Sequence, residues 1–266
     1  MIKPKKSLGQ NFLIDQNTIK KIINSANING NHILEIGPGT GNLTTHIINN
    51  NPLSLTLIEK DEKILDQLKR NLKFENKLIF FCEDVLDFNV EENMREDSIV
   101  FGNLPYNIST QILVNLIKFK KWPPKFKKLV LMFQKEVGEK IIANHNTKNY
   151  SRLSVISGWR LEVVDYFQVS RNCFYPKPKV DSMVLVFVPK IKNKYKIKNI
   201  INIENITRIF FSNKRKMINK GFKKVSSNFE YISKELNIDL KNRPSQLSKD
   251  DYYKIVEFLE KSKNYN

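Results

Sequence analysis

The sequence predicts an α/β protein with a mainly parallel sheet, followed by a small all-helical domain. Through the first two thirds of the chain, short apolar runs alternate with segments whose apolar residues recur at helical spacing. Such alternation is typical of a parallel sheet whose faces are covered by helices. Beyond Lys190 only helical patterns remain. The length of 266 residues fits one large domain and one small one.

The predicted strands are short and apolar. Five belong to the alternating part of the chain: His32–Ile36, Leu53–Ile58, Leu78–Phe81, Ser98–Phe101 and Leu129–Phe133. Between them, the apolar residues of Asp61–Lys73 and of Ser109–Phe119 fall on one face of a helix. Val163–Val169 and Met183–Val188 flank a proline-rich turn, which predicts an antiparallel hairpin at the sheet edge.

The helical part of the chain has its own boundary and its own capping signal. We place the boundary between residues 191 and 192, so that residues 1–191 form the sheet domain and residues 192–266 the helical domain. The segment from Lys190 to Asn202 is rich in lysine without a clear period, as expected of a linker. Ser248 and Asp251 form an S-x-x-D pattern before an apolar stripe, which predicts the start of the last helix.

The charge balance indicates a polyanionic partner. The chain holds 45 Lys and Arg against 27 Asp and Glu, a net charge of +18, and such an excess favours nucleic acid over a membrane surface. A compositional bias toward lysine, asparagine and isoleucine is the competing explanation. Residues 192–266 hold 18 basic against 8 acidic residues, a net +10. Within them, Asn213–Lys216 is either a phosphate-contact cluster or a solvated helix face.

Composition excludes several other classes. The chain is 41% hydrophobic and 27% charged, and its longest apolar run, Met183–Val188, is far shorter than the roughly 20 residues that span a bilayer. We expect no membrane segment, no targeting peptide and a cytoplasmic location. Cys82 and Cys173 form no C-x-x-C pair, and the three histidines are scattered, so we expect a reducing compartment and no metal site.

A glycine-rich turn follows the first strand of the alternating part. It reads Glu35-Ile-Gly37-Pro-Gly39-Thr-Gly41, and glycines allow a ligand to approach the backbone closely. The spacing G-x-G-x-G differs from the dinucleotide pattern G-x-G-x-x-G, which disfavours nicotinamide binding. The turn resembles that of S-adenosylmethionine-dependent enzymes. A plain turn between strand and helix is the alternative.

Acidic residues close the next two strands. Glu59 stands where a carboxylate can accept both ribose hydroxyls, and Asp84 where it can accept an adenine amino group. Ligands of open parallel sheets bind at the carboxyl ends of the strands, so both side chains and the glycine-rich turn converge on one nucleoside. Each acid taken singly could instead cap the helix or turn that follows it. Together they predict S-adenosylmethionine as the cofactor.

The fourth strand ends in Asn103-Leu104-Pro105-Tyr106, a pattern typical of enzymes that methylate a planar exocyclic amine. The lone pair of adenine N6 is delocalised into the ring, so the amine reacts only when acceptors hold its hydrogens out of plane. The Asn103 side-chain oxygen and the Leu104 carbonyl supply those acceptors, Pro105 fixes the backbone, and Tyr106 offers a π-face. An ordinary Asn-Pro-Tyr turn is the alternative.

Phe174 lies on the proline-stiffened turn of the predicted hairpin. Two interpretations stay open for its ring. It could stack on a base extruded from its helix, opposite Tyr106, or it could be a core residue that anchors the hairpin.

Taken together, five segments resemble the ribosomal RNA adenine dimethyltransferase family of the KsgA type over essentially the whole chain. They are Gly9-Gln-Asn-Phe-Leu13, Glu35–Gly41, Asn103-Leu-Pro-Tyr-Asn-Ile-Ser109, Gln134-Lys-Glu-Val137 and Phe174–Ser182. The resemblance implies a Rossmann-like S-adenosylmethionine-dependent methyltransferase sheet with a C-terminal helical RNA-binding domain. It implies dimethylation of N6 of two adjacent adenosines in the 3′-terminal hairpin of small-subunit (16S) ribosomal RNA, late in the biogenesis of the subunit.

The same resemblance assigns roles to individual residues. The cofactor contacts it implies are Asn11, Leu13, Gly37, Gly39, Glu59, Asp84 and Asn103. It makes the N-terminal Gly-Gln-Asn-Phe-Leu segment a lid over the methionine end of the cofactor. It also implies a monomer whose partner is the immature small ribosomal subunit. One departure is Ser151, where the family commonly has glycine.

Three rival functions share parts of this pattern. Antibiotic-resistance methylases act on large-subunit RNA with a similar core, but the N-terminal segment and Asn-Leu-Pro-Tyr favour the small-subunit branch. DNA adenine methylases more commonly carry two prolines after the Asn or Asp, and they need a target-recognition domain. A non-catalytic RNA-binding factor is disfavoured by the intact Asn103, Pro105 and Tyr106.

Overall fold

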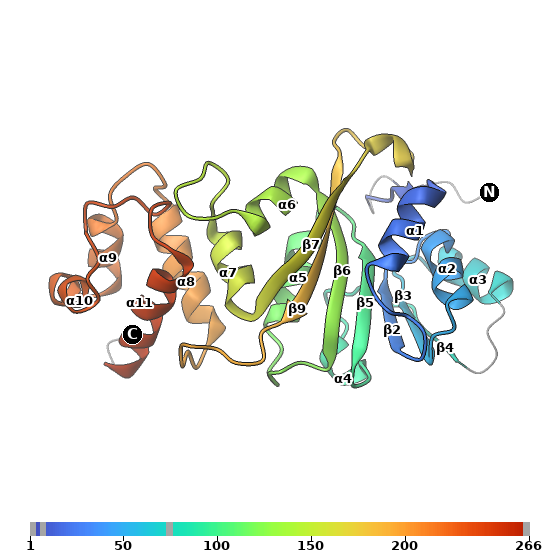
Figure 1. Cartoon of the computed structure of the whole chain (residues 1–266), viewed down its shortest axis with the longest axis horizontal. Helices are drawn as coiled ribbons and strands as arrows, with labels where there is room; N and C mark the ends of the chain where they lie inside the picture. The colour runs from blue at the N-terminus through green and yellow to red at the C-terminus, as the bar shows by residue number, and fades with distance from the viewer. Residues whose placement is uncertain (1–3, 6–8, 73–76, 263–266) are drawn as a thin grey trace. The chain divides into compact units, whose positions relative to one another are not determined.

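A computed structural model of the chain describes residues 4–5, 9–72 and 77–262. The chain divides into two compact units (Figure 1). The first unit consists of Met1–Gly138 with Glu162–Pro189, and the second of Glu139–Leu161 with Lys190–Asn266. None of the helices in the described ranges is both long enough and apolar enough to cross a membrane.

A seven-stranded mixed sheet forms the first unit. Its strands are β2 (His32–Ile36), β3 (Ser54–Ile58), β4 (Leu78–Phe81), β5 (Ser98–Asn103), β6 (Phe126–Gln134), β7 (Leu161–Val169) and β9 (Ser182–Pro189). Their order is β4-β3-β2-β5-β6-β9-β7. Strands β2 to β6 run parallel, and β9 runs antiparallel to β6. The expected α/β sheet, mixed at one side, is therefore confirmed.

Helices join the strands as the alternation predicts. Those that begin in the first unit are α1 (Gln16–Asn24), α2 (Asn42–Asn49), α3 (Glu62–Asn71), α4 (Val90–Asn93), α5 (Ser109–Ile117) and α6 (Lys135–Ile142). The helix predicted from Asp61 begins one residue later, because the Asp61 side chain caps α3 by accepting a hydrogen bond from the Lys63 amide. The predicted end of that helix, Lys73, lies outside the described residues.

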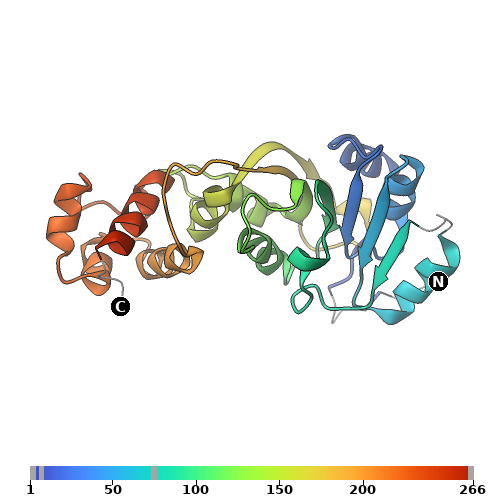
Figure 2. The same cartoon turned by 90° about the horizontal axis from the view of Figure 1, so that it is seen from below.

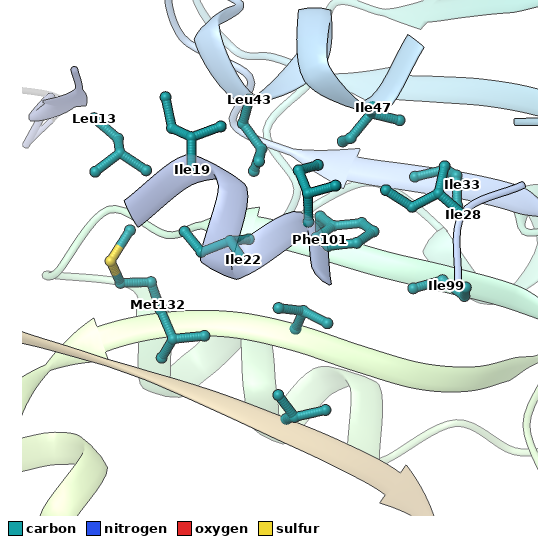
Figure 3. Close-up of a cluster of buried hydrophobic side chains, with 14 of the residues drawn as sticks. Leu13, Ile19, Ile22, Ile28, Ile33, Leu43, Ile47, Ile99, Phe101 and Met132 are labelled. Carbon is teal, nitrogen blue, oxygen red and sulfur yellow. The ribbon is translucent and has the colours of Figure 1, made fainter. Parts of the chain in front are cut away.

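Helices α1 and α2 pack on one face of the sheet (Figure 3). The inward residues of α1 are Ile19 and Ile22, which join Leu43 of α2 and Phe101 of β5 in one hydrophobic cluster. The spacing of three along α1 puts its isoleucines on a single face, which explains why this polar segment folds onto the sheet. This packing holds the loops at the carboxyl ends of β2 and β5 in place.

The first unit also contains a separate two-stranded ribbon, which includes a strand near the N-terminus. Strand β1 (Phe12–Leu13) pairs antiparallel with β8 (Phe174–Tyr175), which follows a short 3₁₀ helix at Arg171–Cys173. The Ile14 amide continues this pairing by donating to the Cys173 carbonyl at 2.9 Å. The N-terminal segment and the proline-rich turn, far apart in sequence, therefore lie side by side.

The second unit is helical. It contains α7 (Arg152–Arg160), α8 (Ile200–Phe211), α9 (Asn219–Val225), α10 (Phe229–Glu235) and α11 (Lys249–Lys261), of which α8 to α11 are drawn orange to red in Figures 1 and 2. The structure groups α7 with these helices, whereas the sequence pattern placed residues 139–161 in the sheet domain. The physical reason is packing, because Trp159 of α7 contacts Tyr253 of α11 and the Tyr253 hydroxyl donates to the Val155 carbonyl at 2.6 Å.

Two local features of the second unit follow from sequence. Ser248 and Asp251 form the predicted capping box at the start of α11. Ser151, where a glycine is common in the family that the chain resembles, has φ −156° and lies in extended backbone before α7. An L side chain adopts this conformation without strain, so the serine leaves the local fold intact.

Candidate active site

A pocket lies at the carboxyl ends of the central strands. The sheet order changes direction between β2 and β5, with β3 and β4 on one side and β6 on the other. Open α/β sheets bind their ligands at this switch point. Five stretches line the pocket: residues 9–13, 35–43 without Gly41, 58–60, 83–85 and 103–108. These stretches contain all of the predicted cofactor residues.

The glycine-rich turn needs its glycines. Gly37, Gly39 and Gly41 have φ values of +69°, +55° and +83°, which L side chains rarely adopt. A Cβ on Gly39 would lie 2.9 Å from the Phe12 ring, and one on Gly41 would lie 2.6 Å from Leu68. The glycines therefore permit both the turn and its close contact with the N-terminal segment.

Glu59 and Asp84 line the pocket as predicted, each in a different electrostatic setting. The nearly buried Glu59 carboxylate accepts hydrogen bonds from the amides of Asp61 at 2.9 Å and Gly39 at 3.3 Å, and burial raises its pKa. Asp84 accepts from Lys60 Nζ at 2.6 Å and from the Leu86 amide at 3.0 Å. The bond from Lys60 lowers the pKa of Asp84, so this carboxylate is charged at neutral pH.

A third carboxylate, Glu35, lies under the glycine-rich turn. It is almost fully buried, and Thr44 Oγ1 of α2 donates to its Oε2 at 2.7 Å. Desolvation raises the pKa of Glu35 to about 8, with the nearby charge of Glu59 acting in the same direction. Glu35 is therefore largely protonated at neutral pH in this state.

The N-terminal segment forms one wall of the pocket. Asn103 Nδ2 donates to the Asn11 carbonyl at 3.0 Å, and Asn42 Nδ2 donates to the Leu13 carbonyl at 2.7 Å. Asn11 and Leu13 therefore reach the pocket, as the resemblance implied, and their backbone is bonded to side chains at the ends of β5 and of the glycine-rich turn.

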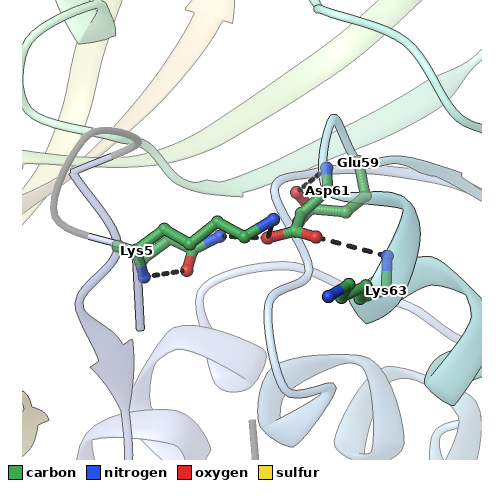
Figure 4. Close-up of polar contacts among 5 residues, drawn as sticks. Lys5, Glu59, Asp61 and Lys63 are labelled. Atoms are coloured by element: carbon green, nitrogen blue, oxygen red, sulfur yellow. Dashed lines mark hydrogen bonds and ion pairs between the residues drawn. The ribbon is translucent and has the colours of Figure 1, made fainter. Parts of the chain in front are cut away.

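A polar network fastens the same segment to α3 (Figure 4). The Asp61 carboxylate receives Lys5 Nζ at 2.8 Å and Gln10 Nε2 at 3.2 Å, while it also caps α3. Gln10 in turn accepts from the Lys5 amide at 2.8 Å. The network holds Gln10 and its neighbours against the pocket.

The predicted catalytic motif begins at Asn103, the last residue of β5, and continues into the loop after the strand. Because Asn103 Nδ2 is committed to the Asn11 carbonyl, Oδ1 is the atom left to accept a hydrogen bond. Leu104 and Pro105 continue the pocket wall. The Tyr106 hydroxyl lies 2.6 Å from Ser182 Oγ, the first residue of β9. This arrangement provides an acceptor and an aromatic ring in the lining of the pocket.

Phe174 is the one predicted site residue that the structure does not bring to the pocket. Its side chain is 3% exposed and belongs to the hydrophobic cluster that contains Leu13, Ile19 and Val169. This position matches the alternative in which the ring anchors the turn. The ring would have to leave the core to stack on a base.

The lining fits S-adenosylmethionine. Glycines with positive φ let a ligand lie against the turn, and the carboxylates of Glu59 and Asp84 can accept from ribose hydroxyls and an adenine amine. When bound, this cofactor supplies an electrophilic methyl group. Within the described ranges, no group of three or more His, Cys, Asp and Glu side chains could hold a metal ion.

Comparison with known families decides the assignment. The family model described as Ribosomal RNA adenine dimethylase matches residues 1–261. The chain belongs to the ribosomal RNA adenine dimethylase family. A relative from Pelagibacter ubique (strain HTCC1062), named Ribosomal RNA small subunit methyltransferase A, is 44% identical over 259 residues, 97% of this chain and 98% of the relative. A protein of the same name from Rhizobium etli (strain CIAT 652) is 36% identical and covers 96% and 92%.

Solved structures agree with this membership. A dimethyladenosine transferase from Plasmodium falciparum is similar with a TM-score of 0.77 and 27% identity, covering 95% of this chain and 98% of that one. The 23S rRNA methyltransferase ErmE shares the fold, with a TM-score of 0.68 and 21% identity over 94% and 99%. Membership confirms the Rossmann-like methyltransferase fold, the enzyme class and S-adenosylmethionine as the methyl donor.

Several residues of the dimethylase site were missed in the sequence pattern: Gln10, Asn42, Thr44, Lys60 and Ser182. Two of them could have been found from their position in the sequence. Lys60 directly follows the predicted acid Glu59, and Ser182 is the last residue of the Phe174–Ser182 segment that resembles the family. Asn42 and Thr44 reach the site only because α2 begins at the glycine-rich turn. Gln10 acts through Asp61, a partner that the sequence spacing does not reveal.

Proposed function

We propose that this dimethylase methylates N6 of two adjacent adenosines in the 3′-terminal hairpin of small-subunit ribosomal RNA, placing two methyl groups on each. The observation that carries the proposal is the orientation of Asn103. Its amide nitrogen is held by the Asn11 carbonyl, which leaves Oδ1 as an acceptor beside the cofactor pocket. The curated relatives are named for the small subunit, which supports that substrate.

The proposed chemistry needs positioning more than acid or base catalysis. Asn103 Oδ1 and the Leu104 carbonyl accept from the N6 hydrogens, which turns the nitrogen lone pair toward the methyl group. S-adenosylmethionine held by Glu59, Asp84 and the glycine-rich turn would supply the methyl group to N6, and one N6 proton would pass to water. Tyr106, bonded to Ser182, offers its ring to the adenine face. Alignment of this kind supplies a large part of a rate enhancement.

A hairpin loop suits this site. A base must leave its stack to bring N6 into a pocket, and extrusion costs least where bases are already partly unstacked. The second methylation requires the methylated amine to rotate and present its remaining hydrogen. We infer that Leu104, in place of the proline common in DNA adenine methylases, leaves room for that rotation.

In this proposal the enzyme acts as a monomer in the cytoplasm, and it binds the immature small ribosomal subunit. The net charge of +10 over residues 192–266 supports phosphate contacts by the helical segment. The exposed basic side chains in and near α9 include Lys220, Lys223 and Lys224. Their replacement by alanine should lower RNA affinity and flatten its dependence on salt, while cofactor affinity stays constant.

The decisive experiment supplies labelled S-adenosylmethionine with three substrates: small subunits lacking the modification, large subunits and duplex DNA. Nucleoside mass spectrometry of the products should show N6,N6-dimethyladenosine in small-subunit RNA alone. Incorporation confined to large-subunit RNA or to DNA would overturn the proposal.

Asn103→Ala provides the matched catalytic control. Its effect belongs to the transition state, so turnover should fall far more than RNA affinity. Near-normal turnover of this variant at saturating cofactor would remove Asn103 from the reaction.

A further inference from the structure

The turn that buries Phe174 exposes its neighbour. Tyr175 is 60% exposed, whereas Phe174 is 3% exposed. Alternation along strand β8 explains the contrast, because successive side chains of a strand point to opposite faces. Phe174 points into the core, and Tyr175 presents an aromatic ring to solvent.

Tyr175 shares its face of the ribbon with Phe12. The two residues are directly opposite in the antiparallel pair, and the other pair, Leu13 with Phe174, is buried in the core. Opposite residues of such a pair lie on the same face. Phe12 lines the cofactor pocket and lies against Gly39. Tyr175 therefore lies on the same face of the ribbon as Phe12, a residue of the pocket lining, although Tyr175 itself is outside that lining.

The segment after Tyr175 runs to the catalytic motif and is held in place along its course. The Arg171 amide donates to Asp181 Oδ1 at 3.0 Å, and its guanidinium donates to the Lys179 carbonyl at 3.2 Å. The next residue, Ser182, lies 2.6 Å from the Tyr106 hydroxyl. Residues 171–182 thus connect the N-terminal wall of the pocket to Tyr106.

This segment is basic. Arg171, Lys177 and Lys179 are exposed, and Asp181, which is already bonded to the Arg171 amide, is the one acid in residues 171–182. Within the part of the chain that the structure describes, the ammonium groups of Lys177 and Lys179 form no hydrogen bond or ion pair. An exposed aromatic ring beside free ammonium groups is the combination by which proteins hold single-stranded nucleic acid.

We propose that Tyr175, Lys177 and Lys179 form a second nucleotide subsite, which holds an unpaired RNA nucleotide next to the target adenosine. The Tyr175 ring stacks on the neighbouring base, and the lysines contact the phosphates on either side. The subsite rests on the proposed function and deepens it, because it fixes how the loop strand passes the pocket. Tyr175 is a positioning residue, since it lies outside the lining of the pocket.

Tyr175→Ala tests the stacking contact in the full-length enzyme. Loss of one base stack should raise the KM for undermethylated small subunits about tenfold, with little change in kcat at saturating substrate. Tyr175→Phe keeps a π-face and should retain the wild-type KM. Tyr166→Ala removes a tyrosine that is 54% exposed on β7 and should leave KM unchanged.

The affinity of Tyr175→Ala for S-adenosylmethionine distinguishes loss of base stacking by Tyr175 from a structural change in the ribbon of β1 and β8. Calorimetry should give the same affinity for S-adenosylmethionine in the wild type and in Tyr175→Ala. A parallel loss of cofactor affinity would show that Tyr175 acts through Phe12, and an unchanged KM for the subunits would show that it contacts no RNA. Either result would overturn the subsite.

A modified substrate locates the stacked base. In a hairpin RNA with two adjacent loop adenosines, each flanking nucleotide is replaced in turn by an abasic one. At one position the replacement should weaken wild-type binding about tenfold and leave Tyr175→Ala binding unchanged. If no position removes the difference between the two proteins, the ring does not stack on a flanking base.

The lysines are tested by the salt dependence of binding to the same hairpin. Lys177→Ala and Lys179→Ala should each reduce the slope of log affinity against log salt by about one. Unchanged slopes in both variants would remove the phosphate contacts from the proposal. Failure of the proposed function is distinguishable, because the wild-type enzyme would then not methylate small subunits at all.

Discussion

The hydroxyl of Tyr106 lies 2.6 Å from the hydroxyl of Ser182. This contact joins the catalytic motif after β5 to the first residue of β9, two strands away in the sheet. Ser182 is fully buried, and burial raises the pKa of the Tyr106 hydroxyl. The Tyr106 ring, which lines the pocket, is thereby held by a neutral hydrogen bond.

Ser182→Ala should loosen the Tyr106 ring. The lost hydrogen bond should lower the free energy of unfolding by about 1 kcal/mol and should lower kcat while cofactor affinity stays constant. Tyr106→Phe removes the same bond from the other side, so the double variant should be no slower than Tyr106→Phe alone. Additive losses of kcat in the double variant would show that the serine acts independently of the tyrosine.

Glu59→Ala and Asp84→Ala should each weaken the binding of S-adenosylmethionine. Loss of a hydrogen bond to a charged group costs about 1.5 to 3 kcal/mol, which corresponds to roughly tenfold to a hundredfold in affinity. Calorimetry measures the effect, with Asp87→Ala as a control because Asp87 is exposed and outside the lining. Unchanged affinity in both pocket variants would contradict their roles as nucleoside acceptors.

Glu35 should make the stability of the cofactor-free protein depend on pH. Its folded-state pKa of about 8 lies above the ordinary 4.5, so between these values the folded state binds more protons than the unfolded state. The contribution of protonated Glu35 to the free energy of unfolding is therefore fully present below about pH 4.5 and is lost as pH rises through about 8. The loss is up to about 1.4 kcal/mol per pH unit.

Urea unfolding between pH 5.5 and 7.5 measures this dependence. Glu35→Gln should reduce the slope, because glutamine can still accept from Thr44 and carries no charge, while Glu59, whose pKa burial also raises, keeps part of it. Glu62→Gln, at an exposed site on α3, should keep it. Equal slopes in the wild type and in Glu35→Gln would assign the pH dependence to another group.

Phe174→Ala should act mainly on stability. Truncation of a buried phenylalanine costs about 3 to 5 kcal/mol, whereas Tyr175→Ala next to it should change the free energy of unfolding by no more than about 0.5 kcal/mol. Chemical denaturation of the two variants gives the comparison. A nearly neutral Phe174→Ala variant with impaired turnover would instead favour the base-stacking role.

Much of the site was predictable because its residues follow short apolar strands. Glu59, Asp84 and Asn103 come directly or within a few residues after runs that alternation identifies as parallel strands, and such strands end at one edge. The bonds between these residues were not predictable. Asn103 is oriented by the backbone of Asn11, a contact across 92 positions that no local pattern contains.

The orientation of the proline-rich turn was unpredictable for a different reason. Which of Phe174 and Tyr175 faces the core depends on the register of β8 against β1, and each of these strands has only two residues. A shift of one residue would exchange the two rings. The grouping of α7 with the second unit also could not be predicted from the sequence, because it depends on packing between aromatic residues that are far apart in the chain.

The pairing of β1 with β8 has a consequence for the folding of the enzyme during its synthesis. During synthesis Phe12 and Leu13 leave the ribosome long before their partners Phe174 and Tyr175. A growing chain that lacks β8 offers β1 no strand to pair with, so we expect this wall of the pocket to form only when the sheet unit is nearly complete. We expect slow hydrogen exchange of the Ile14 amide, which donates to the Cys173 carbonyl, only in chains in which the two strands have paired.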